Sequence, residues 1–120
     1  MKIYTSYFAK MKHLPTDVVP ISICAKPPAF YTGLQYKKIA PSYRCLMDYK
    51  SDHDEDAFVK KYFDDVLCKL DQKTIENEIK ELSQGKDVAL LCFEKSTDFC
   101  HRHVFATWMK MANIDVTEYK

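Results

Sequence analysis

The sequence predicts an α/β fold in which a mostly parallel sheet of four or five strands is covered by helices on both faces. Residues 87–93 contain the run Val-Ala-Leu-Leu-Cys-Phe, which is apolar on both faces, as in the centre of a parallel sheet. Shorter runs of strand-forming residues occupy 2–8, 18–24 and 114–119, and helical segments separate the strands. The 120 residues fit one domain, which we expect to span 1–120.

The first half of the chain holds two strands and a long loop. Residues 18–24 form a short apolar strand, and Pro20 places its start at an edge or a bulge because proline has no amide hydrogen to donate. The loop 27–41 gathers aromatic residues around Gly33 between prolines. Such a loop predicts a pocket wall or lid, and the alternative is that its rings plug the core from outside. A short helix is expected over 42–50.

The second half is dominated by helical patterns. The acidic cluster 51–56 provides an N-cap and favourable charge for an amphipathic helix that buries one face over 58–70. A calcium-binding loop does not fit the cluster, because the ligand spacing and the central glycine are missing. A second, more superficial helix is expected over about 72–84, closed by Gly85. A third helix is expected over about 99–112.

Composition excludes several classes of function. The chain has 18 basic and 17 acidic residues, so direct nucleic-acid binding is not expected. It has no apolar run of the roughly 18 to 20 residues that a membrane helix needs, and its start does not resemble a signal peptide. We therefore expect a cytoplasmic protein without a membrane partner. The five cysteines include no Cys-x-x-Cys pair, which argues against a zinc ribbon or a thioredoxin-type redox pair.

The strongest candidate for a functional site is the turn from the central strand into the last helix. In parallel sheets ligands bind beyond the carboxyl ends of the strands. Ser96, Thr97 and Asp98 are all suitable N-caps, so the segment 100–102, Cys-His-Arg, falls in or near the first helical turn. The backbone amides and the helix dipole at this position favour an anion. A cysteine beside arginine and histidine there has reason for a lowered pKa.

This arrangement predicts a pocket for a small anionic or nucleotide-like ligand. If a reaction takes place, Cys100 is the candidate nucleophile, and Glu94 or His101 is the candidate proton carrier. Arg102, one of only two arginines, would hold the anion, and two aromatic residues of the loop would stack on a base. The predicted ligand-binding residues are Arg102, Ser6, Lys26, Tyr31, Tyr36 and Cys92.

Neither a cofactor nor a metal is predicted. The residues Cys92, Cys100, His101 and His103 could surround zinc, but their spacing matches no standard zinc site. A cysteine phosphatase is also disfavoured. Its phosphate-binding loop separates nucleophile and arginine by a short glycine-containing stretch that this chain lacks.

The segment Asp87–Lys95 followed by Phe99–His103 resembles the signature of the family called domain of unknown function 488, whose members are small bacterial and phage proteins. Residues 2–8, 20–23 and 31–41 also resemble its compact members. The resemblance implies a Rossmann-like three-layer sandwich and no particular reaction. It also implies a shared site, which maps here onto Cys92, Glu94, Cys100, His101 and Arg102. The chain departs from the larger members, because they place a Gly-His-Ser-like turn after the first strand where it has Thr5-Ser6-Tyr7.

Three functions are therefore compatible with the sequence, and whether the protein is an enzyme is left open. The leading one is an anion- or nucleotide-binding pocket at the carboxyl edge of the sheet. The second is a non-catalytic phage or host interaction protein that binds or sequesters a nucleotide or a protein. The third is an accessory factor of nucleic-acid modification, which the near-neutral charge disfavours. The ligand, the oligomeric state and the conformation of 27–41 are not determined by the sequence.

Overall fold

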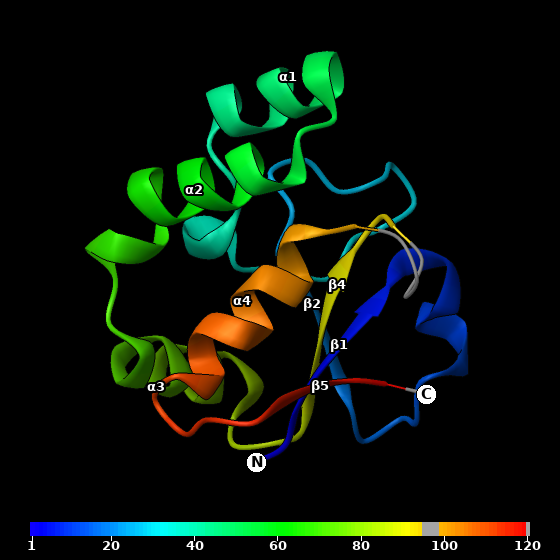
Figure 1. Cartoon of the computed structure of the whole chain (residues 1–120). Coiled ribbons are helices and arrows are strands. Elements are labelled where there is room, and N and C mark those ends of the chain that lie inside the picture. Colours follow the sequence, from blue (N-terminus) through cyan, green and yellow to red (C-terminus); the bar gives the residue numbers. More distant parts are fainter. Residues whose placement is uncertain (95–98, 120) are drawn as a thin grey trace.

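A computed structural model describes residues 1–94 and 99–119, and its five strands form one parallel sheet (Figure 1). The strand order is β3-β2-β4-β1-β5, and every pairing is parallel. This arrangement confirms the predicted α/β sheet. The strands are β1 (Ile3–Tyr7), β2 (Val19–Ser22), β3 (Leu34–Gln35), β4 (Val88–Cys92) and β5 (Val116–Glu118).

The first three α-helices of the described residues begin at capping side chains. The Ser42 hydroxyl accepts a hydrogen bond from the backbone amide of Cys45, and Asp54 and Asp71 cap the next two α-helices in the same way. No helix in the described part of the chain is long and apolar enough to cross a membrane. The α-helices are α1 (Tyr43–Asp52), α2 (Glu55–Asp65), α3 (Gln72–Ser83) and α4 (His101–Lys110), and the 3-10 helices are η1 (Phe8–His13), η2 (Lys37–Ile39) and η3 (Leu67–Lys69).

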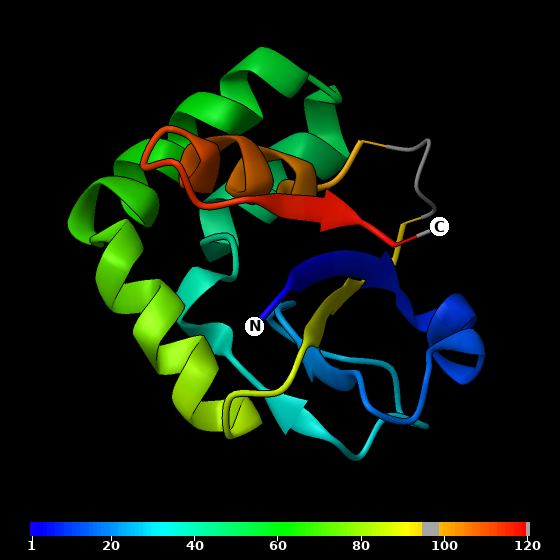
Figure 2. The same ribbon diagram turned by 90° about the horizontal axis from the view of Figure 1, so that it is seen from below.

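The sheet is the middle layer of a three-layer sandwich. Residues of α1, α2, α3 and α4 share one hydrophobic core with Ile3, Ile21 and Leu90 of the sheet. A second core on the other face joins η1 and the loop after β2 to Ala89 and Leu91. The α-helices accordingly lie on one side of the strands and η1 on the other (Figure 2). All five residues of β4 are buried, as predicted for the central strand.

Two predicted elements differ from the structure for local reasons. The helix predicted over 58–70 ends at Asp65, because Val66 leaves helical geometry with φ −126° and ψ −66°, and the chain continues as η3. The loop 27–41 contains β3 and η2. A strand of two residues is too short to give an alternating pattern in the sequence.

Candidate functional site

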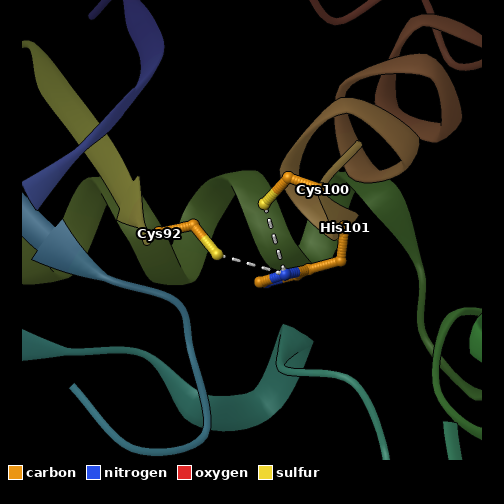
Figure 3. Close-up of side chains that lie close together, drawn as sticks. All are labelled: Cys92, Cys100 and His101. Carbon is orange, nitrogen blue, oxygen red and sulfur yellow. Dashed lines mark hydrogen bonds between the residues drawn. The ribbon is translucent and has the colours of Figure 1, made fainter. Parts of the chain in front are cut away.

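The carboxyl end of the central strand and the start of α4 bring three reactive side chains together (Figure 3). Cys92 is the last residue of β4, Cys100 immediately precedes α4, and His101 is its first residue. All three are buried. Cys92 and His101 are nine residues apart in the sequence, and they meet because α4 begins close to the end of β4.

The imidazole of His101 is held in one orientation between the sheet and the two thiols. Its Nε2 atom lies 3.0 Å from the carbonyl oxygen of Ile23, just after β2. A carbonyl can only accept a hydrogen bond, so Nε2 carries a proton. The other ring nitrogen, Nδ1, lies 3.5 Å from Cys92 Sγ and 3.8 Å from Cys100 Sγ. The edge of the ring also packs against Tyr62, with centroids 5.7 Å apart.

The pKa values of the two thiols are shifted in opposite directions. The neighbouring Cys92 thiol is the largest influence that lowers the pKa of Cys100, and His101 lowers it further, whereas burial opposes both. The pKa of Cys92 is raised, by Cys100 and by burial. Cys100 is therefore the sulfur that loses its proton first. Glu94 Oε2 lies 3.3 Å from Cys92 Sγ, and the pKa of Glu94 is raised by loss of solvent and by the charge on Cys100.

A cavity of about 480 Å³ opens beside this cluster. Much of its wall is aromatic, and Tyr49 and Phe99 stack with their ring centroids 5.2 Å apart. Two exposed lysines, Lys26 and Lys50, also line it. The cavity thus combines a broad apolar wall, a cationic rim and a polar patch of sulfur, nitrogen and carboxylate. The lining residues are Cys24, Ala25, Lys26, Pro41, Tyr43, Leu46, Met47, Tyr49, Lys50, Phe58, Cys92, Phe93, Glu94, Phe99, Cys100 and His101.

A comparison with models of known protein families shows to which family the chain belongs. A family model described as DUF488-N3a, the active DUF488-N3 subclade, matches residues 11–113. The chain belongs to the DUF488-N3a family. This confirms the resemblance seen in the sequence, and the match includes the whole Cys92–Arg102 segment. No curated protein and no solved structure gave a significant match.

Five of the residues predicted from the sequence meet at this cavity of the DUF488-N3a fold. Cys92, Glu94, Cys100 and His101 form the polar patch, and Lys26 lies at the rim. The N-caps predicted at 96–98 lie outside the described residues. The position that precedes the helix is Cys100, whose side chain does not cap it.

Arg102 does not line the cavity, contrary to the sequence prediction. Its side chain is 0% exposed, and Nε and Nη2 donate hydrogen bonds to the Glu118 carboxylate at 3.1 and 3.2 Å. Nη1 donates to the backbone carbonyl of Glu94 at 2.7 Å. These bonds join the start of α4 to β5 and to the chain after β4. The guanidinium of Arg102 is thus engaged within the protein.

Three further predicted ligand contacts are also absent from the cavity wall. Tyr31 and Tyr36 are buried, and their hydroxyls donate to the backbone of Leu34 and to the Glu78 carboxylate. The alternative interpretation, in which these rings plug the core, describes them better than base stacking does. Ser6 is buried in β1, where its hydroxyl has no hydrogen-bond partner among the described residues.

Sequence reasoning missed the helical wall of the cavity. Leu46, Met47 and Tyr49 come from α1, and Phe58 comes from α2. Their apolar character was visible, but a helical pattern does not show whether a residue faces the core or a cavity next to it. Glu118, the partner of Arg102, was missed because the pairing depends on β5 lying beside β1.

The cluster can also hold a metal ion. The donor atoms of Cys92, Cys100 and His101 lie within 4.8 Å of one another, and His103 is not part of this group. The spacing of these residues in the sequence matches no standard metal motif. The fold brings Cys92, at the end of β4, next to Cys100 and His101, at the start of α4.

Proposed function

We propose that this chain binds a small molecule with a flat ring and an anionic group, and that Cys100 reacts with it as a nucleophile. The observation that supports this proposal is the convergence of Cys92, Cys100 and His101 on one cavity, with His101 Nδ1 directed at both sulfurs. A nucleophile beside a base that a third group orients is the usual arrangement of covalent catalysis. The matched family is described as an active subclade, which agrees with a reacting site.

Each group has a role in the proposed reaction. His101 Nδ1 takes the proton of the Cys100 thiol, and the carbonyl of Ile23 keeps the ring in the required tautomer. Sγ of Cys100 then forms a bond to an electrophilic carbon of the ligand, while the bond from that carbon to the leaving group breaks and the leaving group takes the electron pair. Glu94, whose raised pKa favours its protonated form, supplies a proton to the leaving group.

The walls of the cavity indicate the class of ligand. Tyr49, Phe58 and Phe99 offer faces and edges of aromatic rings to a planar group. Lys26 and Lys50 place positive charge at the rim, where an attached phosphate or carboxylate would lie. A nucleotide-like molecule combines these two properties. We infer that Arg102 supports this site without contacting the ligand.

The first test measures the reactivity of each cysteine. The full chain is treated with iodoacetamide at neutral pH in the presence of a metal chelator, and alkylation is followed by peptide mass spectrometry. Cys100 is expected to react on the order of tenfold faster than Cys68, because its sulfur is ionised and opens onto the cavity. Cys68 is the internal reference because it is exposed. A Cys100 that reacts more slowly than Cys68 would contradict the nucleophilic role and leave a binding protein.

The second test concerns the lysines at the rim. Nucleoside monophosphates and the corresponding nucleosides are compared as ligands by thermal shift and calorimetry. The Lys26→Ala and Lys50→Ala variants are each expected to weaken monophosphate binding roughly tenfold, the effect of losing one charged hydrogen bond. Lys86→Ala is the matched control, since Lys86 is exposed near the opposite end of β4. Equal binding of nucleosides and monophosphates would contradict the assignment of the anion to this rim.

A further inference from the structure

Two of the three separations between the donors of the cluster, those between sulfur and nitrogen, fit a tetrahedral metal ion. With zinc–sulfur bonds of about 2.3 Å and zinc–nitrogen bonds of about 2.0 to 2.1 Å, a sulfur and a nitrogen on one tetrahedral zinc ion lie about 3.6 Å apart. In this protein His101 Nδ1 lies 3.5 Å from Cys92 Sγ and 3.8 Å from Cys100 Sγ. The two sulfur–nitrogen separations therefore suit such an ion, and all three donor atoms lie within 4.8 Å of one another.

The surroundings of His101 are those of a metal-binding histidine. Such histidines usually donate the hydrogen of the second ring nitrogen to a carbonyl or a carboxylate, which fixes the ring and aims the free lone pair at the metal. Here Nε2 donates to the backbone carbonyl of Ile23 at 3.0 Å. The lone pair of Nδ1 is left facing the two sulfurs (Figure 3).

The chemical types of the three donor atoms indicate which metal ion the cluster would bind. Two sulfurs and one imidazole nitrogen favour zinc over magnesium or calcium, which prefer oxygen ligands. Glu94 Oε2 lies 3.3 Å from Cys92 Sγ but does not belong to the group of donors that lie within 4.8 Å of one another.

We propose that Cys92, Cys100 and His101 bind one zinc ion, and that the zinc-bound cluster and the reactive thiol are alternative states of the same site. The second part rests on the proposed function of Cys100. Zinc binds both sulfurs as thiolates and Nδ1 by its lone pair, so the proton on Cys92 and the proton shared by Cys100 and His101 are released to solvent. The ion also occupies the electron pair with which Cys100 would attack. A metal ion would thus switch the nucleophile off until a competing ligand or chelator removes it.

The metal-binding part is tested by cobalt substitution, because tetrahedral cobalt bound to thiolates has strong visible bands and a sulfur-to-cobalt charge-transfer band. The metal-free full chain is expected to give these bands with one cobalt per chain, and zinc is expected to abolish them. Cys92→Ser, Cys100→Ser and His101→Gln are each expected to weaken cobalt binding at least 100-fold. Cys24→Ser is the matched control, since Cys24 lies buried in the same cavity wall but outside the group of donors.

The switching part is tested by alkylation of wild-type protein with and without one equivalent of zinc. Zinc is expected to slow the modification of Cys100 at least tenfold and to leave that of Cys68 unchanged. Cobalt bands together with a Cys100 that stays inert under chelation would support the metal site and overturn the proposed nucleophile. A wild-type protein without tetrahedral cobalt bands would overturn the metal site, whatever the reactivity of Cys100, and this result does not depend on whether any variant folds.

Discussion

Replacement of Arg102 by alanine is expected to lower the free energy of unfolding by about 3 to 5 kcal/mol. The guanidinium is fully buried and makes three hydrogen bonds, two of them to a Glu118 side chain that is only 17% exposed. Alanine would leave that carboxylate and the carbonyl of Glu94 without their main donor, although the Thr5 hydroxyl still donates to Glu118 at 2.7 Å. The loss is measured by urea denaturation.

The chain contains its own control for this substitution. The other arginine, Arg44, also makes a two-pronged ion pair, with Asp65, but its side chain is 57% exposed. Arg44→Ala should therefore lower the stability much less than Arg102→Ala, because water screens an exposed ion pair. If Arg102→Ala cost no more than Arg44→Ala and instead abolished ligand binding, Arg102 would be a ligand contact, as the sequence alone suggested.

The difference between these two arginines shows where sequence reasoning reached its limit. The rarity of arginine drew attention to Arg102, which the structure shows to be fully buried, and its place beside Cys100 and His101 puts it near the carboxyl end of β4. Whether a guanidinium faces a ligand or a carboxylate depends on what lies opposite, and here that is Glu118, sixteen residues later in the chain. The pairing of β1 with β5 sets this contact, and no local pattern reports it.

The elements and residues that could be predicted are those determined by local chemistry. The apolar composition of β4 indicates burial on both faces. Asp54 and Asp71 indicate where two helices begin. Cys92, Glu94, Cys100 and His101 could be placed together because the end of a parallel strand and the start of the following helix must be close. Tyr31 and Tyr36 could not be placed, because an aromatic residue in a loop serves equally well as a core plug or as a pocket wall.

Replacement of His101 by glutamine is expected to slow the alkylation of Cys100 on the order of tenfold to 100-fold in metal-free protein, because a free thiol with a pKa of about 8.5 is only a few per cent ionised at neutral pH. Glutamine can still donate a hydrogen bond to the carbonyl of Ile23, but it has no basic nitrogen to accept the proton of the thiol. Since Nδ1 faces both sulfurs, its loss removes the basic group beside Cys100 and leaves Cys92 as the main remaining influence that lowers the pKa of Cys100. The second-order rate constant with iodoacetamide at neutral pH provides the measurement.

The matched control for this effect is His103→Gln, which makes the same change two residues further along α4, at a histidine that is not part of the cluster. This variant should alkylate at the wild-type rate, and Cys68 should react equally fast in all three proteins. Comparable thermal unfolding of both variants would exclude a general loss of structure. Wild-type reactivity in His101→Gln would mean that the imidazole does not activate the sulfur. The proximity of Cys100 to His101 would then serve only packing or metal binding. A cobalt titration of the same variant distinguishes these two, because replacing His101 weakens cobalt binding only if the imidazole is a ligand.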